Sequence, residues 1–272
     1  MNTVIFPLIN LNLSIENIAF SILGIDIYWY GIIIVTGIII GLLYLKSQDG
    51  KFNIKFTDVV DLLIFLIPIS IASARVYYVI FDISYFAKYP MEIFNIRSGG
   101  LAIYGGIIGG IITGIIFCKK RKIKVLDLFD YLVPALLLGQ AIGRWGNFVN
   151  IEAYGTETIL PWKMGIYELG EYKEVHPTFL YESVANLVLF FIISKIGKKR
   201  KFTGQLTYLY LIGYGLIRML IEGIRADSLM LGPIRISQLL SAVILISGMI
   251  LYKKRFSSKW FWTKSFILPA SI

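Results

Sequence analysis

The chain contains one cysteine and one histidine among its 272 residues. A single cysteine excludes a disulfide or a cysteine-rich metal site within one chain. Cys118, beside Lys119 at the end of an apolar run, is therefore interpreted as a packing residue. The opening residues, MNTVIFPLIN, lack the basic stretch that begins a cleavable signal peptide. We expect them to remain in the mature protein.

Acidic side chains are also scarce, with 17 Asp and Glu against 27 Lys and Arg, which gives a net charge of +10. Such an excess suits either a nucleic acid or a membrane surface. The basic residues fall in short clusters next to apolar runs, where anionic lipid and the insertion machinery act on them. With 57% hydrophobic residues and a mean hydropathy of +0.72, the composition predicts a polytopic membrane protein that contacts membrane lipids and no nucleic acid.

A membrane-spanning helix needs about 20 mainly apolar residues. Seven stretches meet this requirement, without a convincing internal repeat among them. They lie at approximately 27–45, 58–81, 99–118, 126–146, 177–195, 203–222 and 233–252. The sequence therefore predicts an all-α membrane protein of seven transmembrane helices, forming a single membrane domain over residues 1–272.

Basic residues are distributed unequally between these stretches. Eighteen Lys and Arg lie on one side, in the loops after the first, third and fifth stretches and in the tail, against seven on the other side. Because cytoplasmic loops carry the excess of basic residues, we expect the N-terminus outside and the C-terminus in the cytoplasm. The segment 147–176 is then an extracytoplasmic loop, which we interpret as a small head region with room for short strands, and residues 1–20 form an amphipathic arm at the outer interface.

Most of the unusual polar residues in the apolar stretches then fall at one depth, near the outer leaflet. Ionisable side chains inside a membrane are costly and commonly mark a functional site. Polar side chains can also serve only to hold helices together, but their shared depth favours a functional site. These residues are Tyr30, Arg75, Tyr104, Arg144, His176, Glu182, Arg218, Glu222 and Gln238.

The sixth stretch contains YGLIRMLIEGIR, in which Tyr214, Arg218, Glu222 and Arg225 are spaced by four, four and three residues. This spacing places them on one helical face. Arg218 and Glu222 could simply pair with each other. Together with Arg144, however, the helices hold more cations than one carboxylate neutralises. Two planar guanidinium groups at this depth suit a phosphate.

The stretch GRWGNFVNIEAYG, residues 143–155, resembles the signature of the bacterial prolipoprotein diacylglyceryl transferase family. Similar motifs extend along the chain: WYG at 29–31, GGLAIYGG at 99–106, HPTFLYE at 176–182, YGLIR at 214–218 and RISQLLS at 235–241. The resemblance implies a multi-pass enzyme of the bacterial cytoplasmic (inner) membrane with its active site toward the outer leaflet. Such an enzyme transfers the diacylglyceryl group of phosphatidylglycerol to the cysteine thiol of a lipobox-containing prolipoprotein signal peptide. It forms a thioether and releases glycerol phosphate, the first step of lipoprotein maturation.

The resemblance also implies which residues form the site. Arg144 and Arg218 would hold the phosphate, Asn147, Asn150, Glu152 and Gly155 would shape the site, and Tyr30 and Tyr214 would line it. From the chemistry of the residues, we add Glu152, Glu222 and Tyr104 to the two arginines as the catalytic set. The substrate-binding set is expected to comprise Tyr30, Asn147, Asn150, Gly155, Tyr214, Arg225, His176 and Gln238. No metal or other cofactor is expected.

The chemistry suits these residue types independently of the family. Fixed guanidinium groups stabilise charge that develops on a departing phosphate. A thiolate is the nucleophile, so the site must also remove a proton, and Glu152 and Glu222 are both candidate acceptors. Many family members carry a histidine where this chain has Tyr104 in IYGG. Because a phenol, with a pKa near 10, is a poor base, Tyr104 is assigned to hydrogen bonding or positioning. Tyr104→Phe should therefore keep some activity where Arg144→Ala loses all.

His176 precedes Pro177 at a helix start, and we interpret it as structural or interfacial rather than as the base. Two other functional classes stay open. Buried arginines and glycine-rich helices such as GGIIGGIITG at 105–114 also occur in transporters and channels, although these glycines are better explained by close helix packing. A non-catalytic scaffold would tolerate Arg144→Lys, which a bidentate phosphate site would not. Because the polar residues lie toward one side of the membrane, the enzyme is favoured over the transporter and the scaffold.

Overall fold

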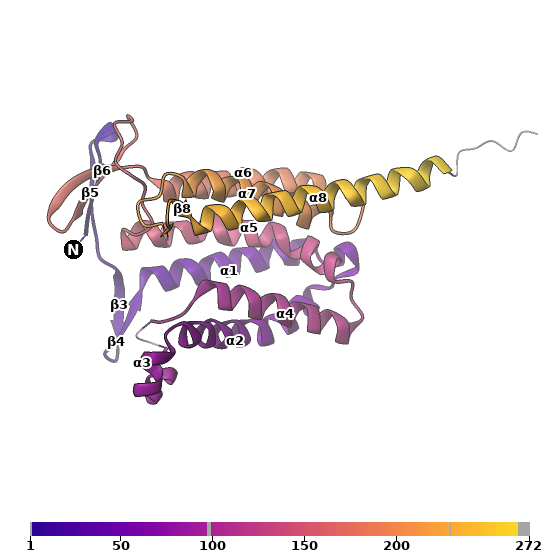
Figure 1. Cartoon of the computed structure of the whole chain (residues 1–272), viewed down its shortest axis with the longest axis horizontal. Coiled ribbons are helices and arrows are strands. Elements are labelled where there is room, and N and C mark those ends of the chain that lie inside the picture. The colour runs from indigo at the N-terminus through magenta and orange to yellow at the C-terminus, as the bar shows by residue number, and fades with distance from the viewer. Residues whose placement is uncertain (1, 97–98, 229, 266–272) are drawn as a thin grey trace, which may run out of the picture. The chain divides into compact units, whose positions relative to one another are not determined.

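The computed structural model describes residues 2–96, 99–228 and 230–265. Arg97, one of the seven basic residues on the sparsely charged side, lies outside the described residues. The chain forms two compact units, Met1–Leu45 with Leu132–Ile272, and Lys46–Tyr131. Both units consist mainly of long helices, which Figure 1 labels in chain order.

The first unit is built from α1 (Trp29–Ser47), α5 (Val125–Asn150), α6 (Thr178–Gly197), α7 (Gln205–Glu222) and α8 (Ile236–Ser265). Helices α5 to α8 run side by side in Figure 1, and α7 packs on both α6 and α8. Small residues allow close approach between membrane helices. Gly37 and Gly41 of α1 accordingly face Gly139 and Ala135 of α5.

The second unit contains α2 (Phe56–Phe81), the short helix α3 (Ile83–Lys88) and α4 (Ile103–Arg121), together with the beginning of α5. Short 3-10 turns, η2 (Lys51–Asn53) and η3 (Pro90–Phe94), lie in its connections. Helices α2 and α4 pack against each other. Gly105 and Gly109 lie so close to Ser73 that a Cβ atom at either position would collide with it. The packing interpretation of the glycine pattern is therefore confirmed at these two positions.

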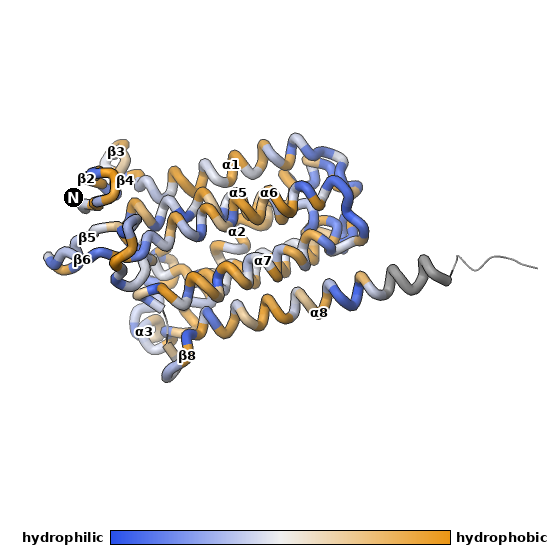
Figure 2. Tube along the Cα trace, turned by 90° about the horizontal axis from the view of Figure 1, so that it is seen from above, coloured by the Kyte–Doolittle hydropathy of each residue, from blue (hydrophilic) through white to orange (hydrophobic). Residues whose placement is uncertain are grey.

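Each of the seven predicted stretches overlaps one long helix. Among the described residues, six helices are long and apolar enough to cross a membrane: α1, α2, α4, α5, α6 and α8. The seventh, α7, is 18 residues long but more polar, because Gln205, Arg218 and Glu222 lie within it. Figure 2 shows hydrophobic residues along the helices and hydrophilic residues at many of their ends.

The prediction of an all-α protein was incomplete, because the described residues also contain short strands. They are β1 (Asn2–Phe6), β2 (Leu11–Ile15), β3 (Ile18–Ile22), β4 (Ile25–Tyr28), β5 (Met164–Glu168), β6 (Glu171–Val175), β7 (Met230–Leu231) and β8 (Ile234–Arg235). Four of them form a sheet in the order β2-β1-β5-β6, while β3–β4 and β7–β8 are separate hairpins. The strands expected in the head region are thus present, as β5 and β6. The N-terminal arm, in contrast, is folded into strands.

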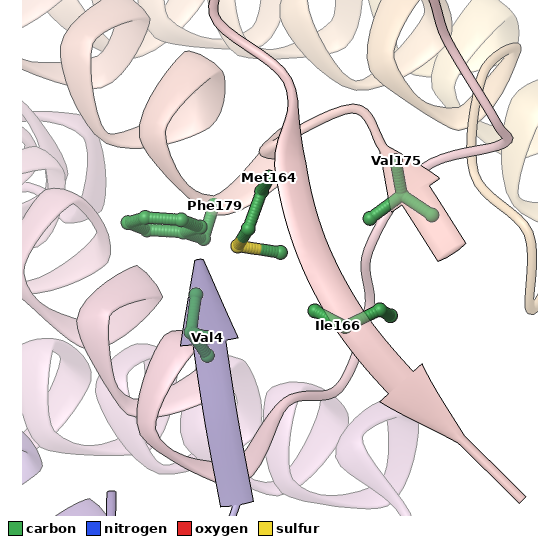
Figure 3. Packing of buried hydrophobic residues seen from close by; sticks show 5 residues of the cluster. All are labelled: Val4, Met164, Ile166, Val175 and Phe179. Atoms are coloured by element: carbon green, nitrogen blue, oxygen red, sulfur yellow. The ribbon is translucent and has the colours of Figure 1, made fainter. Parts of the chain in front are cut away.

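A small hydrophobic core joins this sheet to the helices. It consists of Val4, Met164, Ile166, Val175 and Phe179, of which Phe179 lies in the first turn of α6 (Figure 3). Val4 of β1 pairs with Ile166 of β5, so the N-terminus is tied to the head region. Partly buried Phe148 of α5 packs against the same core. The core therefore fixes the end of α5 and the start of α6 beside the sheet.

Candidate active site

Three helices of the first unit bring two arginines onto one carboxylate. Arg144 of α5 forms an ion pair with one oxygen of Glu182 in α6, with an N–O distance of 2.6 Å. Arg218 of α7 pairs with the other oxygen of Glu182 at 2.9 Å. The Glu182 side chain is almost completely buried, with 2% of the residue exposed. Glu182 thus bridges the two arginines expected to hold a phosphate.

The ion pairs continue beyond this bridge as an alternating series of charges. Arg218 also donates to Glu222, one helical turn further along α7, at 2.6 Å. Glu222 is 2% exposed and lies 4.0 Å from Arg225, whose guanidinium binds Asp227 through two hydrogen bonds of 2.9 and 2.8 Å. Buried charges are tolerated when they are paired and hydrogen-bonded. Both buried carboxylates are ion-paired, and Arg218 donates a hydrogen bond to each of them.

At the other end of the series, α5 supplies a polar side chain one turn beyond Arg144. Asn147 accepts a hydrogen bond from Arg144 at 3.1 Å and donates one to Glu152 at 2.8 Å. The backbone N–H of Glu152 also donates to the Asn147 carbonyl at 3.0 Å, which closes the turn after α5. Glu152 is exposed, in contrast to Glu182 and Glu222. Of the three glutamates in the cluster, it is the one accessible to a second substrate.

Tyrosines line the cluster. Tyr30 at the start of α1 interacts electrostatically with Glu152 and Arg144, and its ring lies 2.7 Å from the position that a Cβ atom of Gly146 would occupy. Tyr214 of α7 interacts in the same way with Glu182 and both arginines. A further ring, Tyr210, stacks on Tyr214 with centroids 5.3 Å apart, and its hydroxyl accepts a hydrogen bond from Gln140 at 2.8 Å.

The C-terminal end of α7 is held by side chains from the following segment. Arg235 donates to the carbonyl of Glu222, and Gln238 donates to the carbonyl of Met219 at 3.1 Å. These bonds satisfy carbonyls that a helix end leaves without partners. Gln238 was expected to bind substrate. In the structure its side-chain amide supports the helix that carries Arg218, and its part in substrate binding stays a prediction.

A cavity of about 470 Å³ lies between α7 and α8, beside the supported helix end. Its lining is mainly apolar, with Arg235 and Gln238 as the polar members. The apolar lining residues are Met219, Leu220, Pro233, Ile234, Leu239 and Ala242. Such a recess suits a hydrocarbon chain that extends from a polar group.

Comparison with known proteins decides the family. The model of the family "Prolipoprotein diacylglyceryl transferase" matches residues 17–253. The chain belongs to this family. It is similar to the phosphatidylglycerol–prolipoprotein diacylglyceryl transferase of Finegoldia magna, with 49% identity over 244 residues that cover 88% of this chain and 97% of the relative. It is also similar to the transferases of Clostridium novyi (47% over 247 residues; 87% and 95% covered) and Clostridioides difficile (45% over 235; 86% and 93%).

Within this member of the transferase family, Glu182 is the site residue that sequence reasoning left out. It was recognised as a polar residue of the motif HPTFLYE but not placed in the catalytic or binding set. The sequence feature that could have identified Glu182 is its spacing from Thr178 and Asn186. These three polar residues are four apart and all buried on one face of α6. A buried polar face in an apolar helix commonly marks a functional site.

His176 and Gly155 belong to the base of the head region. The His176 ring lies 3.3 Å from the Tyr181 hydroxyl, which also accepts a hydrogen bond from Trp162 at 2.7 Å. Gly155 donates its backbone N–H to the His176 carbonyl at 3.0 Å. A Cβ at Gly155 would lie only 2.6 Å from that of His176. These contacts support the structural interpretation of His176. They also explain by close packing why position 155 holds a glycine.

The remaining expected residues differ in what surrounds them. Arg225 is engaged by Asp227, as described above. Asn150 is the last residue of α5, and its role stays a prediction. Tyr104 is the second residue of α4 and belongs to the other unit. Its part in the reaction also stays a prediction.

A hydrogen-bonded triad stabilises the head region. The Tyr154 hydroxyl donates to Glu168 of β5, and Lys173 of β6 donates to the second oxygen of Glu168 at 2.6 Å. Burial and the contact with Glu168 raise the pKa of Tyr154 to about 12. Hydrogen bonds from Lys173 and Tyr154 hold the pKa of Glu168 below its ordinary value. The triad ties the segment that follows the signature to the β5–β6 hairpin.

Proposed function

We propose that this chain transfers the diacylglyceryl group of phosphatidylglycerol to the lipobox cysteine of lipoprotein precursors, and that the cluster around Glu182 is the reaction site. The reaction is the one named for its relatives. The single observation that carries the placement is the convergence of Arg144 and Arg218, from two helices, on one buried carboxylate.

Arg144 and Arg218 are assigned to the phosphate of the lipid. A guanidinium group carries five N–H donors in a fixed plane. The ion pairs with Glu182 set the orientation of both groups before substrate binds. Preorganised donors in a site shielded from water stabilise the charge that builds on the departing phosphate. The cavity beside α7 is assigned to an acyl chain of the same lipid.

In the transfer step, the cysteine sulfur attacks the glycerol carbon that is bonded to the phosphate oxygen. A sulfur–carbon bond forms, the carbon–oxygen bond breaks, and glycerol phosphate leaves with the bonding electron pair. The thiol proton must pass to a base. We assign it to Glu152, which is exposed and hydrogen-bonded to Asn147. Glu222 is buried against Arg218, and protonating it would break that ion pair.

The membrane arrangement is proposed from the sequence and from the ends of the helices. We propose seven crossings, α7 included, in the bacterial cytoplasmic membrane, with the N-terminus outside and the C-terminus inside. The clustered residues lie at the ends of α5 and α7 and at the start of α6, and these ends are opposite to the basic loop at 195–201. The site would then face the outer leaflet. Residues 147–176 form an extracytoplasmic head within one membrane domain and contact the lipobox peptide.

Purified protein in detergent tests this function. Wild type, phosphatidylglycerol and a lipobox peptide should release glycerol phosphate and give a peptide whose mass increases by one diacylglyceryl group, whereas the Cys→Ser peptide should give neither. Arg144→Lys should abolish both signals, because an ammonium group cannot replace bidentate donors. Arg121→Lys, at an exposed surface pair, should retain them. Absence of transfer by folded wild type would reject the proposal in favour of a transporter or scaffold.

A further inference from the structure

We infer that Arg75 is a positioning residue for this reaction, because its guanidinium fixes the loop that leads into Tyr104. The inference rests on the proposed function and extends it to the second unit. Arg75 lies in α2, within the apolar helix, and 7% of the residue is exposed. The sequence places it at the depth of the phosphate-binding arginines, but its contacts are of a different kind.

All five N–H donors of the Arg75 guanidinium bind backbone carbonyls. Nε donates to Ile93 at 2.9 Å, one terminal nitrogen donates to Gly99 at 3.1 Å and Gly100 at 2.9 Å, and the other donates to Glu92 at 2.5 Å and Asn95 at 3.1 Å. A guanidinium group has no further donor to offer. Arg75 is therefore fully used in organising the connection between α2 and α4.

The charge of Arg75 is compensated without an acidic partner. Among the described residues, no carboxylate lies within ion-pair distance of its guanidinium. The faces of Phe86 and Tyr78 lie 5.1 and 5.8 Å from it, at distances typical of cation–π contacts. Arg144 and Arg218 are paired with carboxylates instead. The difference in partners indicates that Arg75 holds the backbone of the loop, whereas Arg144 and Arg218 can receive a phosphate.

The loop is shaped to meet this side chain. Gly99 and Gly100 adopt φ values of +98° and +72°, in the region that favours glycine. A Cβ atom at Gly100 would collide with the terminal nitrogen of Arg75. The N–H of Ala102 then donates to the Ala74 carbonyl at 3.1 Å, next to Arg75 in α2. Tyr104 follows two residues later, so its backbone position depends on these contacts.

Two measurements on the variant Arg75→Lys test the inference: hydrogen–deuterium exchange of the loop and the rate of diacylglyceryl transfer. Lysine keeps the charge but has three donors on a single nitrogen. Hydrogen–deuterium exchange in residues 92–96 and 99–104 should rise, whereas exchange in residues 164–175 of the head should not. Turnover, kcat, should fall about 10- to 100-fold, as expected when a reacting group is displaced by about 1 Å. The KM for phosphatidylglycerol should change by less than about twofold, because no binding contact is lost.

Further variants separate positioning from a general loss of structure. Gly100→Ala disturbs the same contact from the loop side and should reproduce both effects, while Gly114→Ala, whose Cβ would meet Phe129 at an ordinary 3.5 Å, should show neither. Arg121→Lys is the matched arginine control. Combined with Tyr104→Phe, Arg75→Lys should lower kcat by less than the product of the two single losses, because both act on one element.

Chemical rescue tests whether the guanidinium group itself, rather than the positive charge alone, restores turnover. A cavity of about 290 Å³ lies beside Arg75, lined also by Tyr78, Asp82 and Phe86. Guanidinium ion should therefore enter Arg75→Ala and restore turnover in a saturable manner, whereas methylammonium at equal ionic strength should not. Wild-type kcat and exchange in Arg75→Lys would overturn the inference and leave the proposed function intact. Absence of transfer by wild type would reject the function, while the exchange result would still report on the loop.

Discussion

At the scale of single residues, the three arginines Arg75, Arg144 and Arg218 divide by the partner each one binds. Arg144 and Arg218 share a carboxylate, whereas Arg75 binds only backbone carbonyls and aromatic faces. All three are polar residues of apolar helices at one predicted depth, so sequence position alone does not separate them. The partner determines whether a guanidinium can exchange its contact for a substrate phosphate.

Glu182 provides a sharp test at this scale. Glu182→Gln removes the charge from a buried bridge and leaves two arginines side by side. Loss of one member of a buried ion pair costs about 3 to 5 kcal/mol, so we expect a large drop in the thermal unfolding temperature together with lower kcat. Scanning fluorimetry and the transfer assay measure both.

The matched control for this prediction is Asp61→Asn, which removes the carboxylate from an exposed pair with Arg121. Exposed pairs contribute about 0 to 1 kcal/mol, so this variant should remain close to wild type. Equal stability of Glu182→Gln and wild type would contradict the assignment of Glu182 as a structural bridge.

At the scale of elements, the β5–β6 hairpin gives a prediction about pH. Glu168 has a lowered pKa in the folded protein, so its contribution to stability is present above its unfolded value, about 4.3, and is lost as the pH falls through the lowered value. Tyr154 has a raised pKa of about 12, so its contribution is present below pH 10 and is lost as the pH rises toward 12.

The hairpin prediction is measured as the difference in unfolding temperature between wild type and Glu168→Gln. The difference should be constant near neutral pH and should close on acidification. Glu171→Gln, at an exposed position of β6, should show no such closing difference. If the difference in unfolding temperature persisted unchanged below the lowered pKa of Glu168, the stability of the triad would not depend on the charge of Glu168.

The same scale shows what the sequence could predict. Every long apolar run became a helix, because length and hydropathy are sufficient signals for a membrane helix. The short strands of residues 2–28 were missed, because five-residue strands carry little periodic signal and depend on distant partners, as Val4 does on Ile166. Likewise, Arg144 and Arg218 could be found from motif and spacing, but their bridging by Glu182 required the packing of three helices.

At the scale of the whole molecule, the proposed orientation can be tested in intact cells. In a Cys118→Ser background, a cysteine in place of Ile159, which is 95% exposed in the head region, should react with a membrane-impermeant maleimide. A cysteine in place of Lys199, between α6 and α7, should react only after the membrane is opened, because basic loops remain cytoplasmic. Reversal of this labelling pattern would overturn the orientation and move the site to the inner leaflet.

The position of Glu182 between the two arginines has a further consequence for turnover. Each oxygen of this carboxylate is paired with one arginine. A lipid phosphate that binds there must displace an internal competitor, which weakens substrate binding. The same competitor is covalently tethered, so it recaptures the arginines at high effective concentration when the bond to phosphate has broken. The carboxylate would thereby expel the glycerol phosphate that the reaction generates and prevent the enzyme from being inhibited by its own product.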